Sequence, residues 1–255
     1  MLFKILICLF AGAGAGIGTG FAGMSAAAII GPTLATCLGM PAYQALGIGL
    51  ASDVLASAIS AWVYHKHGNL DIKNSLVLLV TVIVMTIFGS FIGSFVPNRS
   101  MGGMQQIGLI CVGIKFLVKP ARATKEQMTA GSLKSRVIKA IAGGTVVGFI
   151  CGFIGAGGGM MLLFVLTSIL GYEMHMAVGT SVFIMMFTAF TGATSHMVIG
   201  GVPDPVCIIS CIVFTFLWAR IAAKIANKVD SITLSRMAGA VMVGFSVIIL
   251  CVGLL

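Results

Sequence analysis

Charged residues are scarce in this chain: Asp, Glu, Lys and Arg together make up 8% of its 255 residues. A soluble domain carries about 25% charged residues, and a soluble surface cannot be built from so few. Hydrophobic residues supply 59% of the chain, and the mean hydropathy is +1.14. The shortage of charge therefore excludes a soluble globular protein and predicts an all-α polytopic membrane protein.

Other absences narrow the function. The sequence lacks a G-x-x-x-x-G-K-[ST] motif, so energy must come from an ion gradient or a separate partner. The net charge of +9 comes without a basic tail, so we attribute it to cytoplasmic loops and expect no nucleic-acid partner. The seven cysteines lie in apolar stretches, where core packing is the preferred interpretation. A metal or redox pair at Cys207 and Cys211 is the alternative, and we expect no metal and no cofactor.

The chain contains an internal repeat. Residues 16–71 resemble residues 148–203 without a gap, at a constant offset of 132 positions. The matched positions include Gly16 with Gly148, Gly20 with Gly152, Gly23 with Gly155, Gly39 with Gly171 and Gly68 with Gly200. Repeats inside a very apolar chain indicate a transporter of two halves, with its site where the halves meet. We therefore expect a first membrane repeat at 1–118, a basic cytoplasmic linker at 119–139 and a second membrane repeat at 140–255.

Each half has one long apolar span followed by three spans of crossing length. A membrane-crossing helix needs about 20 residues. The spans of that length are 42–64, 74–96, 103–118, 174–198, 205–226 and 236–254. The first spans, 2–38 and 140–170, are too long for one crossing, and glycines interrupt them. Each is a heavily tilted helix, a re-entrant hairpin or two short helices.

Loop charges predict how the halves are oriented. If each long span crosses once, the halves are parallel and the basic 220–236 region lies outside. If each long span returns to the side it entered, only Lys4 and Arg99 of the 15 Lys and Arg lie outside. Because basic residues collect on the cytoplasmic side, the second arrangement is favoured. We predict two inverted repeats, each with a broken or re-entrant first span plus three transmembrane helices, and both termini outside.

The glycine break of the second half predicts an anion site at Gly157, Gly158 and Gly159. Lipid cannot satisfy the backbone groups of a break, so they must face protein or a wet cavity. A helix that starts after the break directs N–H groups and partial positive charge at the gap. Thr180 and Ser181 open the next helix and could add hydroxyl donors. The alternatives are glycines that serve close helix packing and hydroxyls that bond to helix carbonyls.

The opposite side of this site is expected from the first half, at Ser25 and Ser52. Next to them lies Asp53, an acidic residue well inside a span. Insertion of a carboxylate at that depth costs about 2.5–3.5 kcal/mol, and such groups usually face a cavity or a partner. Proton coupling is the functional interpretation of Asp53. A structural hydrogen bond to a neighbouring helix, or a place nearer the interface, is the alternative.

These motifs together resemble a known family. The run from Gly152 to Gly159, then Leu170-Gly171, then Ala177-Val178-Gly179-Thr180-Ser181 is similar to the hallmark of the TauE/SafE sulfite exporter family, also called the toluene-sulfonate uptake permease family. Pro32-Thr33-Leu34 and Leu38-Gly39 fit the same pattern in the first half. The first half departs from it at residues 24–27, where glycines are expected, and it lacks the Thr-Ser pair.

The resemblance covers essentially the whole chain and implies a function. It implies a multi-pass secondary transporter in the inner membrane that carries sulfite, an organosulfonate or a related anion. The implied partners are the small anionic substrate, the lipid bilayer and, through Asp53, protons. A cation or metal transporter that uses Asp53 and the methionines is the alternative. A membrane-embedded enzyme would need clustered acid, base or metal ligands within the spans, so we predict that the chain is not an enzyme.

Overall fold

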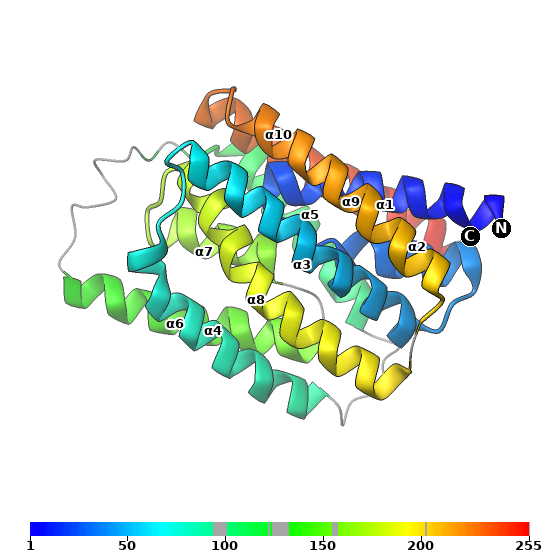
Figure 1. Cartoon of the computed structure of the whole chain (residues 1–255). Coiled ribbons are helices and arrows are strands. Elements are labelled where there is room, and N and C mark those ends of the chain that lie inside the picture. The colour runs from blue at the N-terminus through cyan, green and yellow to red at the C-terminus, as the bar shows by residue number, and fades with distance from the viewer. Residues whose placement is uncertain (94–100, 122, 124–132, 155–157, 202, 255) are drawn as a thin grey trace.

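The computed structural model describes residues 1–93, 101–121, 123, 133–154, 158–201 and 203–254, and this part of the chain is all helical (Figure 1). The helices are α1 (Leu2–Ala22), α2 (Ala27–Leu38), α3 (Ala42–Lys66), α4 (Ile72–Gly93), α5 (Met101–Val118), α6 (Leu133–Ile154), α7 (Gly159–Ser168), α8 (Met174–Gly200), α9 (Pro205–Ala226) and α10 (Ser231–Leu254). Seven of them are long and apolar enough to cross a membrane. The prediction of an all-α polytopic membrane protein is confirmed.

The first span of each half is a long helix followed by a short one. Helix α1 stops at Gly23, whose φ of 57° is left-handed, a conformation that glycine adopts without steric cost. The N–H of Gly23 donates to the Thr19 carbonyl at 3.0 Å and that of Met24 donates to the Gly18 carbonyl at 3.1 Å. This pattern is a helix-ending cap. The structure thus differs from the three alternatives for the long spans: each is one helix long enough to cross, α1 or α6, followed by one short helix, α2 or α7.

The helix bounds repeat at the offset seen in the sequence. Helices α2 and α7 begin at Ala27 and Gly159, and α3 and α8 begin at Ala42 and Met174, in both cases 132 positions apart. In Figure 1, α3 and α8 run in opposite directions, and so do α4 and α9. The division into two repeats stays our interpretation of this pattern, and the orientation of each repeat in a membrane stays a prediction.

Glycines at matching positions hold the first helix of each half against the other half. Helix α1 packs along α9, and α6 packs along α4. A Cβ added to Gly16 would lie 2.6 Å from the Thr215 carbonyl oxygen, and one added to Gly148 would lie 2.5 Å from that of Val82. Real side chains do not approach backbone atoms so closely. Both helix pairs therefore depend on glycine, as small residues allow helix backbones to meet in membranes.

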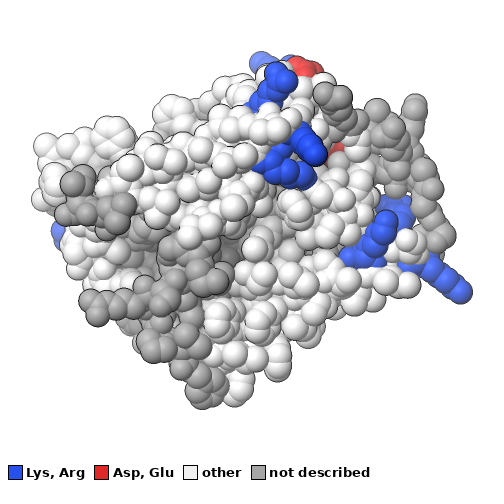
Figure 2. All heavy atoms as spheres, turned by 180° about the vertical axis from the view of Figure 1, so that it is seen from behind, with Lys and Arg blue, Asp and Glu red and all other residues white. Residues whose placement is uncertain are grey.

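Basic side chains collect at one end of the bundle. The Asn69 amide donates to the Asn227 side chain at 2.7 Å, which joins the α3–α4 loop to the α9–α10 loop at this end. On the face shown in Figure 2, the Lys and Arg side chains gather toward it. The described basic residues that flank the adjoining helix ends are Lys66, Lys73, Lys115, Lys119, Lys134, Arg136, Lys139, Arg220, Lys224, Lys228 and Arg236.

The opposite end carries Lys4, whose ammonium group contacts the Asp204 carboxylate at 2.8 Å. This carboxylate also accepts the Val206 N–H at 2.9 Å and so caps α9. The hydrogen bond from Lys4 holds the pKa of Asp204 below its ordinary value. If the basic end lies inside, as the loops predict, Lys4 and Asp204 lie at the outer end of the bundle; this orientation stays a prediction.

Labelling of introduced cysteines tests this orientation. We expect Lys228→Cys to react with a membrane-impermeant maleimide only after the cells are permeabilised, because the α9–α10 loop lies at the basic end. Asp204→Cys should react in intact cells. Both variants are made in a chain whose seven native cysteines are replaced by alanine. Reaction of Lys228→Cys from outside alone would overturn the inverted arrangement.

Candidate functional site

The end of α1 and the start of α7, which flank the breaks of the two long spans, meet in the interior of the bundle. A Cβ added to Gly159, at the start of α7, would lie 1.9 Å from the carbonyl oxygen of Gly23, at the end of α1. A Cβ added to Gly23 would lie 2.3 Å from the Ser181 hydroxyl oxygen on α8. All three residues are buried. The backbone of one half therefore lies directly against the backbone and a hydroxyl group of the other half.

Asp53 fastens helix α3 to the break of the first half. Its side chain is fully buried. The Ser25 hydroxyl donates to one carboxyl oxygen at 2.6 Å, and the Ser57 hydroxyl donates to the other at 3.3 Å. The backbone N–H of Ala26, the N-cap residue of α2, is a third donor. A carboxyl group thus sits at the N-terminal end of α2, where the free N–H groups of a helix favour negative charge.

The position that matches Asp53 in the second half is Met185. A Cβ added to Gly159 would lie 2.5 Å from the Met185 sulfur atom, so this thioether packs on the start of α7. The two halves thus place different groups beside equivalent helix starts, a carboxyl group at α2 and a thioether at α7. Asp53 and Met185 therefore hold matching positions in the two halves but differ in their functional groups.

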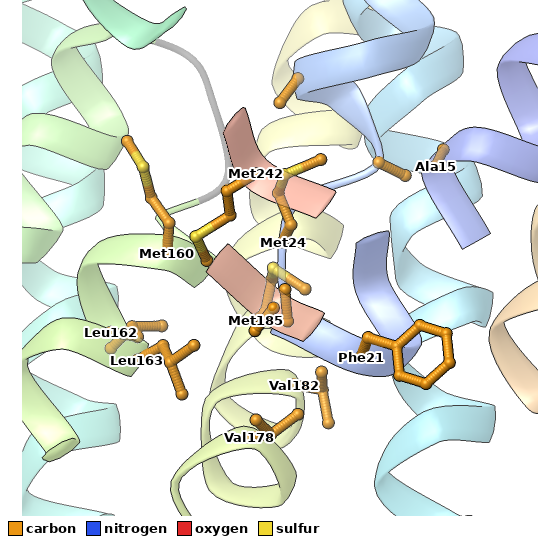
Figure 3. Packing of buried hydrophobic residues seen from close by; sticks show 14 of the residues in the cluster. Ala15, Phe21, Met24, Met160, Leu162, Leu163, Val178, Val182, Met185 and Met242 are labelled. Atoms are coloured by element: carbon orange, nitrogen blue, oxygen red, sulfur yellow. The ribbon is translucent and has the colours of Figure 1, made fainter. Parts of the chain in front are cut away.

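Methionine side chains surround the place where the breaks meet. Met24, Met160, Met185 and Met242 come from the first break, α7, α8 and α10, and they gather in the same part of the core (Figure 3). Each of them is at most 8% exposed. Phe21 and Val182 extend this apolar wall toward α1 and α8 (Figure 3). The centre is therefore closed to solvent in this conformation.

The structure brings together only some of the predicted site residues. Gly159, Ser181, Ser25 and Asp53 lie at the two breaks, with Gly158 as the N-cap of α7. Gly157 falls outside the described residues. The hydroxyl groups of Ser181 and Ser52 donate to the Val178 and Ile48 carbonyls of their own helices, at 2.9 and 2.8 Å. An incoming ligand would have to replace those carbonyls as acceptors.

Thr180 points elsewhere. Its hydroxyl oxygen accepts the Asp71 backbone N–H at 3.3 Å, in the loop that follows α3. The Asp71 carboxylate in turn accepts the Tyr172 hydroxyl at 3.1 Å. Burial and the Asp71 charge raise the pKa of Tyr172, which lies in the α7–α8 loop. Thr180 therefore belongs to a polar network at the basic end of the bundle, and its role in binding substrate stays a prediction.

A second group of polar contacts holds α8 to the α9–α10 loop at this end. Glu173 caps α8, and its carboxylate contacts His175 Nδ1 at 2.7 Å and accepts the Ser231 hydroxyl. His175 Nε2 also lies 3.0 Å from the Val229 carbonyl oxygen. Burial raises the pKa of Glu173, but the bonds from His175 and Ser231 outweigh this effect and hold that pKa at about 2. Glu173 is thus a fixed negative charge that orients His175.

Sequence reasoning missed two polar residues beside the site. Ser57 lies four residues after Asp53, and this helical spacing places both on one face, so the signal was present. Gln106 is buried on α5, where its Nε2 donates to the Ala28 carbonyl at 3.1 Å, and its Oε1 has no partner among the described residues. The Gln105-Gln106 pair in an apolar span was the available signal for Gln106.

Comparison with known proteins now adds to this geometry. The family model described as "Sulfite exporter TauE/SafE" matches residues 8–249. This chain belongs to the TauE/SafE family. It is therefore a multi-pass membrane transporter, and the family and its relatives are named as transporters rather than enzymes. The resemblance stated from the sequence motifs is confirmed.

Two curated relatives match most of the chain. The "Probable membrane transporter protein YdhB" of Bacillus subtilis (strain 168) is 26% identical over 223 residues, which cover 86% of this chain and 89% of the relative. A "Probable membrane transporter protein" of Haemophilus influenzae is 30% identical over 210 residues, which cover 78% of this chain and 76% of the relative. No solved structure matches this chain.

The contact between the two breaks can be tested by adding one methyl group. In Gly159→Ala the new Cβ would meet the Gly23 carbonyl oxygen, a backbone atom that cannot turn away. We expect a loss of stability of about 1–3 kcal/mol, the usual cost of overpacking a core. Thermal unfolding in detergent measures the effect.

The matched control for this variant is Gly108→Ala. Its Cβ would meet the flexible end of Met160 at 3.0 Å, which can move, so we expect little change in melting temperature. If Gly159→Ala melts at the same temperature as the parent, the breaks do not touch in the folded protein.

Proposed function

We propose that this chain is a secondary transporter that carries a small anion, sulfite, an organosulfonate or a related anion, across the inner (plasma) membrane. The observation that carries the proposal is the meeting of two helix breaks at a buried place between matching helices. Broken helices at a repeat interface are where such transporters bind substrates and coupling ions. The name of the family model and the names of the relatives support the same function.

The substrate site we propose lies at Gly158, Gly159 and Ser181, opposite Ser25 and Asp53. Backbone N–H groups at the start of α7 supply partial positive charge without a cationic side chain. In this conformation the Gly23 carbonyl oxygen and the Cys151 sulfur atom fill the places that a Cβ of Gly159 or Gly158 would take, so an anion reaches this backbone only when these contacts open. Ser52, which was predicted with this group, contributes from the neighbouring turn of α3, whereas Thr180 supports the site only indirectly, through its bond with the Asp71 N–H.

Asp53 is the proposed proton-coupling group. Its bonds to Ser25 and Ala26 connect its charge state to the break itself. A bound anion beside the carboxyl group disfavours ionisation, since like charges repel. Protonation of Asp53 and anion binding therefore favour each other, as linkage requires. Proton and anion would then move in the same direction.

A cation or metal transporter is the second candidate, and the cluster of buried methionine thioethers is the observation that favours it. Thioethers bind soft metal ions. The Asp53 carboxyl group is engaged by three donors, which suits an anion or a proton at this place more than a metal ion. Uptake of labelled sulfite against uptake of silver or zinc ions by liposomes that hold the protein separates the two candidates.

Ser181 and Thr180 should now give different results, because they face different parts of the molecule. Ser181→Ala removes a hydroxyl group beside Gly23, and we expect anion binding to weaken about 2- to 10-fold, the usual worth of one hydrogen bond. Thr180→Val removes the acceptor for the Asp71 N–H, and we expect a lower melting temperature with little effect on affinity. Binding of sulfite by calorimetry and thermal unfolding measure the two effects. Unchanged affinity in Ser181→Ala would remove Ser181 from the site.

Replacement of Asp53 tests proton coupling. Asp53→Asn keeps the shape but has a single acceptor oxygen, so it accepts only one of the Ser25 and Ser57 hydroxyls, and it cannot exchange a proton. We expect it to bind anion while its uptake into liposomes no longer responds to a pH gradient. Asp53→Glu, which keeps the acid, is the control and should retain a response. If Asp53→Asn shows the pH dependence of the parent, the carboxyl group has only a structural role.

A further inference from the structure

The walls around the two breaks can replace little of the hydration shell of an ion. Met24, Met160, Met185 and Met242 present polarisable thioethers, which accept hydrogen bonds weakly and donate none (Figure 3). Such walls suit a solute with low charge density. A weakly hydrated ion and a strongly hydrated ion of equal size make contacts of nearly equal energy with such walls. The strongly hydrated ion, however, loses far more hydration free energy when it leaves water.

The ionisable group at the breaks is the Asp53 carboxyl group. Its two carboxyl oxygens already accept bonds from Ser25, Ser57 and the Ala26 N–H. When the group is ionised it repels an incoming anion, and the repulsion grows in proportion to the charge of that anion. When Asp53 is protonated, a bound monoanion gives the centre a net charge of −1, the same as ionised Asp53 alone. A bound dianion gives it a net charge of −2.

Cationic side chains lie toward the basic end of the helices that form this place. Lys66 is 13 residues after Asp53 on α3, or about 20 Å along the helix axis. Lys115 contacts Ser168 and the Phe164 ring on α7, and the exposed Arg236 precedes Met242 on α10 by six residues, or about 9 Å. Charges at such distances are largely screened where water reaches them. The positive field at the centre thus comes from partial charges at helix starts.

We propose that the substrate passes the centre as a singly charged, weakly hydrated anion, so that hydrogen sulfite or a monosulfonate is carried in preference to a dianion such as sulfite or sulfate. The inference rests on the proposed anion transport and adds the charge state of the substrate. The cost of removing an ion from water rises with the square of its charge, so a dianion costs about four times as much as a monoanion of the same size. Thioether walls and helix-end N–H groups do not offset that difference.

Competition between anions of matched shape tests the charge state. Liposomes that hold the protein take up labelled sulfite in the presence of perchlorate, methanesulfonate or sulfate at one fixed pH. Perchlorate and sulfate are both tetrahedral and similar in size, but they carry one and two negative charges. We expect perchlorate and methanesulfonate to reach half-maximal inhibition at concentrations at least about tenfold lower than sulfate. Protein-free liposomes give the background.

The outcomes separate this inference from the proposed function. Sulfate that competes as well as perchlorate would overturn the inference and leave anion transport intact. If methanesulfonate competes and perchlorate does not, the protein recognises the sulfonate group and not the charge. That result would also overturn the inference. The absence of protein-dependent sulfite uptake, with silver or zinc uptake in its place, would overturn the proposed function itself.

A variant adds a second measurement. In Asp53→Asn the fixed acid is gone, so part of the repulsion that acts twice as strongly on a dianion is removed. We expect the ratio between the inhibitory concentrations of sulfate and perchlorate to fall severalfold. In Asp230→Asn, which removes an exposed acid in the α9–α10 loop at the basic end, the ratio should stay the same. A ratio that falls in Asp230→Asn but not in Asp53→Asn contradicts the charge argument.

Discussion

The close approach of helix backbones through glycine is the interaction on which the arrangement of this protein depends. In lipid there is no hydrophobic force between helices, so packing at short range must hold them together. Gly16 on α1 and Gly148 on α6 each lie against a backbone carbonyl of a helix from the other half. Because the contacts cross between the halves in both directions, the two long helices are fixed relative to each other and to the core.

This crossing decides where the breaks lie. Gly16 and Gly148 hold α1 and α6 against the other half shortly before these helices end, and the end of α1 then meets the start of α7 in the interior. A break exposes backbone groups that lipid cannot satisfy. Here the backbone groups at the end of α1 form the Gly23 cap and lie against the start of α7, and the Asp53 carboxyl group bonds to Ser25 beside them. The same glycines that allow packing thus lead to an interior that holds a charged group.

The sequence was most informative where a pattern recurs. The hydropathy spans anticipated the starts of α3 and α8, and the offset of 132 recurs in the starts of α2 and α7, which the sequence left open. The sequence was least informative about which way a side chain points from its helix. Thr180 and Ser181 are neighbours in sequence, but consecutive helical residues point about 100° apart, so one meets Asp71 and the other meets Gly23. The bond between Ser25 and Asp53 joins residues 28 positions apart, a pairing that periodicity cannot show.

The difference between Asp53 and Met185 shows why a repeated scaffold need not repeat its chemistry. Two carboxyl groups at matching places would face each other across a short distance, and at least one would have to stay protonated. One carboxyl group and one thioether avoid that conflict. In our proposal the half with the acid carries the proton and the half with the open glycine backbone carries the anion. Matching helix starts then give the centre its shape, and the unequal side chains give the two ions separate places within it.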